Sequence, residues 1–276
     1  MNTSAEVERH YTSDNIAGRI LAALREVHGA DTPITPDALA PLDQFHGRGV
    51  VATEALAGRL RPQSNERLLD IGSGIGGPAR WMAVHFGCHV TGIDLTRAFC
   101  EAAEALTAAC GLNHRVQIVQ GSATALPFPD AGFDRAWSQN ALMNIADKQR
   151  FYREAFRVLR PGAMFAVDQI GAGQTGSPTY PMPWASVAET SFLSTPEQIR
   201  ADITSAGFEI IELNDTTEAA IAFLEEARRR IQTEGPPRLG VHVVLGERFR
   251  EVMRNSADGL TQHRVSVIQC LLRRPA

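Results

Sequence analysis

Three glycines flanked by two acidic residues form the most informative pattern in this sequence. The run LLDIGSGIGG covers residues 68–77 and places Gly72, Gly74 and Gly76 between a strand-like and a helix-like stretch. Glycines at such a turn allow a tight bend and let a ligand approach the backbone closely. Gly72, Gly74 and Gly77 also fit the dinucleotide fingerprint GxGxxG, but that match alone does not define the ligand.

The two acids distinguish between kinds of ligand. Asp70 stands two residues before Gly72, where its carboxylate would repel a pyrophosphate but accept hydrogen bonds from an ammonium group. Asp94 closes the next strand-like stretch, where it could accept hydrogen bonds from both hydroxyls of a ribose. Asp94 alone would equally suit NAD, so an NAD-dependent oxidoreductase remains an alternative that Asp70 disfavours. The pair favours a nucleoside that carries an ammonium group.

These residues require a scaffold of alternating strands and helices. Short runs rich in Val and Ile, separated by helical patterns, extend from residue 66 to residue 170. This alternation predicts an α/β fold: a Rossmann-like, doubly wound, mostly parallel seven-stranded sheet whose ligand crevice lies at the carboxyl ends of the strands. Strands are expected at 66–72, 89–94, 116–121, 133–139, 164–170, 208–213 and 263–273. Helices are expected at 77–86, 97–111, 147–159, 195–207 and 217–233.

The pattern changes on both sides of this block. Residues 1–60 carry two helical patterns joined by a Pro-containing segment, which predicts an N-terminal helical cap on a domain spanning 61–276. The segment 171–195 follows the fifth strand and is rich in Gly and Pro, yet it carries several aromatic residues. Together with 217–260, it is expected to form a lid.

Composition and charge exclude several classes of protein. A chain of 276 residues with 44% apolar residues can bury a substantial core, which excludes disordered and fibrous classes. A net charge of -4 with scattered arginines offers no basic field for a nucleic acid. We find no signal-peptide pattern at the start and no apolar stretch of about 20 residues, so we expect a cytoplasmic protein without a membrane partner. The cysteines follow no paired spacing, which predicts free thiols, and no metal site is expected.

Four motifs in order along the chain resemble those of class I S-adenosylmethionine-dependent methyltransferases. They are DIGSGIG (70–76), GIDL (92–95), QGSATALPFPDAGFD (120–134) and RVLRPGA (157–163). Three further segments resemble a small-molecule subgroup that includes sarcosine and dimethylglycine N-methyltransferases: DQFHGRG (43–49), YPMPWA (180–185) and SFLSTPEQIRADITSAGFE (191–209).

The resemblance implies an enzyme that transfers a methyl group from S-adenosylmethionine to a nitrogen or oxygen of a small-molecule acceptor. The product would be S-adenosylhomocysteine, no metal would take part, and a homodimer is compatible with the sequence. The alternative from another class is a non-catalytic module that binds the same cofactor.

The resemblance also implies roles for individual residues. The loop from Gly72 to Gly76, with Ser73, would hold the methionyl part of the cofactor, and Asp70 would neighbour its ammonium group. The other cofactor contacts implied are Asp94 for the ribose, Leu95 against adenine, Ser122 and Ala123 at the adenine edge, and Ser138, Gln139 and Asn140 beside the donor methyl group. The family commonly has Asp where Ser122 stands, so we expect weaker binding of the exocyclic amine. The subgroup often has His where Asn140 stands, which bears on any acid–base role given to Asn140.

Methyl transfer is an in-line displacement, and positioning of the reactants can supply about 7–11 kcal/mol of its barrier. A base is therefore not required, although an acceptor amine or hydroxyl must lose its proton. His46 is the candidate base, and the alternative is that it bonds to a loop or to the cofactor carboxylate. Tyr11 and Gln44 are expected over the donor. Tyr180, Trp184 and Phe192 are expected either to shape the acceptor pocket or simply to pack the lid.

Overall fold

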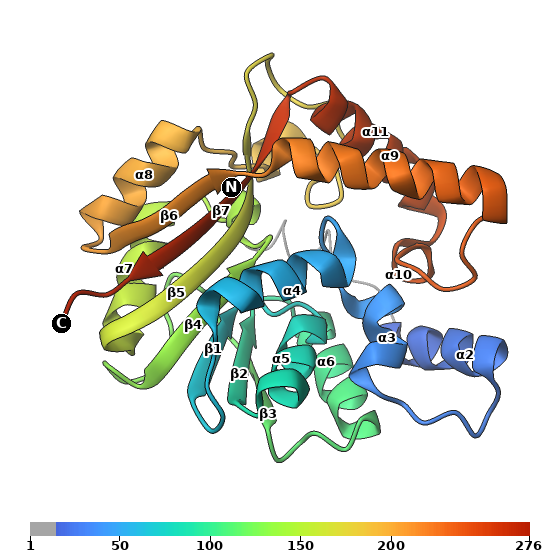
Figure 1. Ribbon diagram of the computed structural model, residues 1–276, viewed down its shortest axis with the longest axis horizontal. Helices are drawn as coiled ribbons and strands as arrows, with labels where there is room; N and C mark the ends of the chain where they lie inside the picture. The colour runs from blue at the N-terminus through green and yellow to red at the C-terminus, as the bar shows by residue number, and fades with distance from the viewer. Residues whose placement is uncertain (1–14) are drawn as a thin grey trace.

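A seven-stranded sheet forms the centre of the computed structural model, which describes residues 15–276 (Figure 1). Its strands are β1 (Arg67–Ile71), β2 (His89–Asp94), β3 (Val116–Gln120), β4 (Phe133–Gln139), β5 (Leu159–Ala172), β6 (Glu209–Asp215) and β7 (Val265–Arg273). The order across the sheet is β3-β2-β1-β4-β5-β7-β6. Strands β1 to β5 are parallel, and β7 runs antiparallel to both β5 and β6. The predicted mostly parallel α/β sheet is confirmed.

Helices cover both faces of this sheet, with α4 and α5 toward the viewer in Figure 1. They are α2 (Ile16–His28), α3 (Pro36–Asp43), α4 (Gly49–Leu60), α5 (Gly77–Phe86), α6 (Arg97–Ala109), α7 (Lys148–Val158), α8 (Pro196–Ser205), α9 (Thr217–Glu234), α10 (His242–Leu245) and α11 (Phe249–Thr261). Leu56 of α4 and Met82 of α5 pack on one face, whereas Phe151 of α7 and Ile199 of α8 pack on the other. Within residues 15–276, none of the helices has the length and apolar character needed to cross a bilayer.

Two expectations about connecting segments are corrected. The Pro-containing segment between the first two helical patterns includes a helix, α3, because the Thr35 side chain caps it and Pro36 occupies its first turn. The region after residue 233 contains α10 and α11 in addition to the expected α9. Elsewhere local signals specify helix ends well: Thr195 and Gln198 form a capping box at the start of α8.

Among the described residues, helix α2 packs against the 217–260 segment. Val243 and Val244 of α10 pack against the apolar cluster that contains Ile20 and Leu24 of α2. Figure 1 shows α10 beside α2, at the far end of the loop that connects α9 to α11. This contact joins regions that are distant in the sequence.

The 171–195 segment is fastened to the turn that follows β4. The backbone N–H of Phe192 donates to the carbonyl of Met143 at 2.8 Å, and the Asn144 side chain donates to the carbonyl of Trp184 at 2.8 Å. Met143 and Trp184 belong to one buried apolar cluster, together with Met182 and Val265. The segment is therefore packed against the carboxyl end of the sheet.

Candidate active site

The glycine run forms the turn between β1 and α5. The backbone N–H groups of Gly72 and Ser73 donate to the carbonyl of Ile93, at 2.8 and 3.0 Å, which ties the turn to β2. A Cβ atom on Gly72 would lie 2.4 Å from the Cβ of Ala141, so the chain after β4 fills that side of the turn. A Cβ atom on Gly74 would meet no atom of the described residues within 4 Å. The open space beside Gly74 is where a ligand can reach the backbone.

The Asp94 carboxylate binds this turn and can still accept further hydrogen bonds. Its Oδ2 accepts a hydrogen bond from the N–H of Gly74, and its Oδ1 accepts one from the N–H of Thr96, both at 2.9 Å. A carboxylate has about four lone-pair positions, so each oxygen can accept a further bond from a diol. Burial raises the pKa of Asp94, and the bonds from Thr96 and Gly74 oppose that shift.

Asp70 presents a buried carboxylate with an unpartnered oxygen. It pairs with Gly92 in the sheet, two residues before Asp94, so both acids stand on the same face. Asp70 is 2% exposed, and its Oδ2 makes no hydrogen bond to any residue from 15 to 276. Burial, reinforced by the nearby Asp94 carboxylate, raises the pKa of Asp70 to about 8. A buried carboxylate without a partner is costly, and an ammonium group of a ligand would supply the missing one.

At the end of β4, one side chain has a structural role and two could contact a ligand. Ser138 donates to the carbonyl of Ile71 at 2.8 Å and is fully buried, which commits its hydroxyl to the sheet. In the part of the chain that the structure describes, Gln139 Nε2 and the buried Asn140 Oδ1 have no hydrogen-bond partner. Asn140 takes a positive φ of 52°, and its backbone N–H donates to the carbonyl of Asp168 at 2.7 Å. Gln139 Nε2 and Asn140 Oδ1 therefore remain available to a ligand.

Gln44, His46 and Gln139 meet around a residue that sequence reasoning missed, Thr53 of α4. The Thr53 hydroxyl lies 2.7 Å from Gln44 Oε1, 3.1 Å from His46 Nε2 and 3.2 Å from Gln139 Oε1. Burial lowers the pKa of His46 to about 4, so the imidazole is neutral near pH 7 and can accept a proton. The available signal for Thr53 was a lone hydroxyl in the mostly apolar stretch GVVATEALAGRL.

Unpartnered buried polar atoms gather at this place. Within residues 15–276, the set includes Gln44 Nε2, Arg48 Nη2, Asp70 Oδ2, Ser73 Oγ, Gln139 Nε2 and Asn140 Oδ1. Buried polar groups in proteins generally have partners, so such a concentration indicates a ligand that supplies them. Donors on Gln44, Arg48 and Gln139 beside acceptors on Asp70 and Asn140 suit a group that carries both an ammonium and a carboxylate. The residues present therefore fit the methionyl end of S-adenosylmethionine.

Asp168 of β5 is a second residue that sequence reasoning missed. It pairs with Gln139 on one side and with Gln269 of β7 on the other, and its Oδ2 accepts a hydrogen bond from Gln269 at 2.8 Å. Burial raises the pKa of Asp168 to about 6, opposed by the Gln269 bond and the nearby Arg48 guanidinium. The signal was a charged residue inside the apolar run MFAVDQI. Asp168 extends the polar row of the site from β4 to β7.

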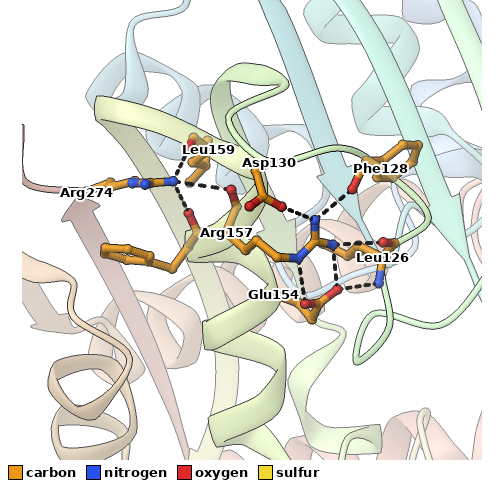
Figure 2. Close-up of polar contacts among 8 residues, drawn as sticks. Leu126, Phe128, Asp130, Glu154, Arg157, Leu159 and Arg274 are labelled. Carbon is orange, nitrogen blue, oxygen red and sulfur yellow. Dashed lines mark hydrogen bonds and ion pairs between the residues drawn. The ribbon is translucent and has the colours of Figure 1, made fainter.

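The loop after β3 carries the residues expected at the adenine edge. Ser122 and Ala123 are partly buried, as is Leu95. Figure 2 shows how the loop is held: Arg157 of α7 donates to the carbonyls of Leu126 and Phe128, at 2.9 and 2.8 Å. Arg157 also pairs with Glu154, which accepts the N–H of Leu126 at 2.8 Å. This clamp positions a loop that has no regular secondary structure of its own.

Tyr180 and Trp184 of the 171–195 segment pack in the apolar cluster that also includes Met143 and Val265. Trp184 is buried in the cluster with Met182, and its Nε1 donates to the Ser191 hydroxyl at 2.9 Å. Tyr180 is partly buried against the same cluster, and Phe192 is partly exposed. Their contact with an acceptor stays a prediction.

Three further expectations concern other parts of the chain. Tyr11 lies outside the described residues. The cysteines are free thiols, as expected. In the part of the chain that the structure describes, no group of three His, Cys, Asp or Glu residues is arranged to hold a metal ion.

Comparison with known proteins identifies the family. Residues 69–167, from β1 to β5, match the family described as "Methyltransferase domain". The glycine/sarcosine/dimethylglycine N-methyltransferase of Actinopolyspora halophila is 32% identical over 60% of this chain, an alignment that spans only 29% of that relative. Methyltransferase GfsG of Streptomyces halstedii is 30% identical over 66% of each chain. The sarcosine/dimethylglycine N-methyltransferase of Halorhodospira halochloris is 27% identical over 92% of this chain and 89% of its own.

Solved structures show the same fold. Phosphoethanolamine N-methyltransferase 2 of Haemonchus contortus, in complex with S-adenosyl-L-methionine, superposes with a TM-score of 0.73 and 21% identity, covering 100% of this chain and 60% of its own. Geranyl diphosphate C-methyltransferase of Streptomyces coelicolor gives a TM-score of 0.72 at 16% identity, covering 99% and 98%. The sheet, the glycine turn and the paired acids define a Rossmann-like methyltransferase fold. The chain belongs to the class I S-adenosylmethionine-dependent methyltransferases.

Proposed function

We propose that this enzyme transfers a methyl group to a nitrogen or oxygen of a small-molecule acceptor and releases S-adenosylhomocysteine. The observation that carries the cofactor part of the proposal is the unpartnered oxygen of buried Asp70 beside Asp94. The names of the N-methyltransferase relatives support a small acceptor, as does the net charge of -4, which disfavours a polyanion.

Different residues of the chain would contact different parts of the cofactor. The turn from Gly72 to Gly76 would hold the methionyl part, with its ammonium group against Asp70. The ribose hydroxyls would reach the free lone pairs of Asp94. The remaining cofactor contacts proposed are Tyr11, Gln44, Ser73, Leu95, Ser122, Ala123 and Gln139, while Ser138 supports them through its bond to Ile71.

Bound S-adenosylmethionine supplies an electrophilic methyl group attached to a sulfonium. The chain must align the acceptor's lone pair with that group and exclude water, and it can do so with the amides of Gln139 and Asn140 at the end of β4. His46 is neutral and connects through Thr53 to Gln139, so we propose that it takes the acceptor's proton. The segments 171–195 and 217–260 would act as a lid over a cap formed by α2 to α4. Tyr180, Trp184 and Phe192 would lie nearest to the acceptor.

Calorimetric titration with S-adenosylhomocysteine tests the cofactor assignment, with NADH as the control ligand. We expect saturable binding of the first and none of the second. The acceptor is then found by incubating the enzyme with labelled donor and a panel of amines, phenols and carboxylates. Tight binding without turnover across the panel would favour a non-catalytic module, and binding of NADH alone would overturn the proposal.

A further inference from the structure

Arg80 of α5 lies beneath the glycine turn and joins three segments. Its side chain is fully buried at 0% exposure. Its Nη2 donates to the carbonyl of Ile75 in the turn at 2.8 Å and to Asp43 Oδ2 at 2.9 Å. Its Nη1 donates to the carbonyl of Ala103 and to the Thr107 hydroxyl of α6, both at 3.2 Å. One guanidinium therefore contacts the turn, the end of α3 and the helix after β2.

The close approach of Arg80 explains why the third glycine position of the run, residue 76, holds a glycine. A Cβ atom on Gly76 would lie 2.8 Å from Arg80 Nη1 and 3.2 Å from the Cβ of Ala103. Gly76 also has a positive φ of 78°. The three glycines thus face different surroundings. Gly72 faces the chain after β4, Gly74 faces open space, and Gly76 faces Arg80.

Asp43 connects the arginine to the segment that carries Gln44 and His46. It is the last residue of α3, and its carboxylate is as deeply buried as the guanidinium that it pairs with. A Cβ atom on Gly77 would lie 2.2 Å from the backbone oxygen of Asp43, so α3 ends in direct contact with the start of α5. Gln44 and His46 follow at once and reach Thr53.

We propose that Asp43 and Arg80 are a positioning pair, which holds the glycine turn and the Gln44–His46 segment in register around the methionyl end of the cofactor. This inference rests on the proposed function. A buried ion pair adds little stability compared with apolar residues of the same volume, so stability alone gives a weak reason for one here. The two terminal nitrogens of the planar Arg80 guanidinium make two hydrogen bonds each, which imposes geometry on every segment that it contacts.

The test compares two ligands that differ only at that end. S-adenosylhomocysteine carries the amino acid tail, whereas 5′-methylthioadenosine keeps the nucleoside thioether without it. In Arg80→Lys the charge remains but the fork of donors is lost, and in Asp43→Asn the shape remains but the charge is lost. For both variants we expect affinity for S-adenosylhomocysteine to fall roughly tenfold or more, and affinity for methylthioadenosine to change less than about twofold.

Arg135→Lys is the matched control. Arg135 pairs with Glu66 at 3.0 Å near the amino ends of β4 and β1, the edge of the sheet opposite the glycine turn. This variant should bind both ligands as the unaltered protein does. Equal losses for the two ligands in the Arg80 and Asp43 variants would reduce the pair to general support of the fold, and unchanged affinity for S-adenosylhomocysteine would overturn the inference. Failure of the unaltered protein to bind S-adenosylhomocysteine would instead overturn the proposed function.

Hydrogen exchange supplies a readout that needs no ligand. Backbone amides of residues 72–77 and 43–48 should exchange faster in both variants, whereas those of β7 should exchange as in the unaltered protein. If Arg80→Lys does not fold, Asp43→Asn carries the comparison. Unchanged exchange in 72–77 would show that the pair does not position the turn.

Discussion

The Oδ2 atom of Asp94 accepts a hydrogen bond from the backbone N–H of Gly74 at 2.9 Å. The acid expected to bind a ribose therefore also closes the glycine turn, and its two possible roles cannot be separated by removing the side chain. Its other oxygen is likewise occupied by the N–H of Thr96.

This geometry predicts that Asp94→Asn is nearly as harmful as Asp94→Ala. An amide would turn its NH₂ group toward one of two backbone donors, so one bond is lost and a repulsive contact replaces it. Hydrogen bonds to charged groups contribute about 1.5–3 kcal/mol, so affinity for S-adenosylhomocysteine should fall roughly 10- to 100-fold in calorimetry. Glu101→Gln, on the exposed face of α6, is the control. Affinity of Asp94→Asn within about twofold of the unaltered protein would contradict the prediction.

Asp70→Asn should stabilise the ligand-free protein while it weakens cofactor binding. Because burial raises the pKa of Asp70 to about 8, the folded state binds this proton more tightly than the unfolded state. The resulting stability is complete below the ordinary pKa of a carboxyl and is lost as the pH rises through about 8. At that pH the variant should gain roughly 1–3 kcal/mol in its free energy of unfolding, the cost of an unpartnered buried polar group.

The gain in stability is measured by thermal unfolding of the unaltered protein and of Asp70→Asn across about pH 5 to pH 8. Only the difference between the two curves is informative, since Asp168 and Asp94 also have raised pKa values. Parallel curves for the two proteins would show that Asp70 does not titrate in this range.

Binding of the cofactor product should release a proton. An ammonium group placed beside Asp70 favours its ionised form, so below about pH 8 the bound carboxyl gives up a proton that it holds in the free protein. Affinity for S-adenosylhomocysteine should then rise with pH, by up to about tenfold per unit, until the pH passes the pKa of Asp70. Calorimetry in two buffers of different ionisation enthalpy counts the released protons. Methylthioadenosine, which lacks the ammonium group, should release none, and the same count for both ligands would contradict the prediction.

Ser122→Asp should strengthen binding if Ser122 faces the exocyclic amine of adenine. A carboxylate accepts that hydrogen bond more strongly than a hydroxyl, by about 1 kcal/mol, which corresponds to roughly fivefold in affinity. The Ser122 hydroxyl lies 2.9 Å from the Thr124 hydroxyl of its own loop. S-inosylhomocysteine lacks the amine and should not gain from the substitution. An equal gain in affinity for both ligands would show that the new carboxylate does not contact the exocyclic amine.

His46→Gln separates a proton-accepting role from a purely structural one. Glutamine can still bond to Thr53 but cannot take a proton, so S-adenosylhomocysteine should bind normally while kcat falls roughly 100-fold or more with an acceptor from the panel. Because burial lowers the pKa of His46 to about 4, kcat of the unaltered enzyme should show no histidine titration between about pH 5 and pH 8. Unchanged kcat in the variant would show that His46 has a structural role and does not accept the proton.

Local signals in the sequence were sufficient for the sheet and for much of the cofactor site. Strand β4 and helix α5 have the bounds that their patterns predicted, because alternation and helical periodicity depend on near neighbours. The glycine turn and its two acids were recognisable for the same reason, since all of them lie at the ends of predicted strands.

The contacts that hold the site together were decided by packing between distant segments. Nothing near Arg80 in the sequence indicates that its guanidinium is buried against Asp43, and Asp168 meets Gln269 only because β7 lies beside β5. A sequence states which residues are polar, but the burial that turns a polar residue into a positioning group, or shifts its pKa, exists only once the chain has enclosed it. The residue types alone therefore determined the fold and the kind of ligand, whereas the tertiary structure decided how the site is held in place.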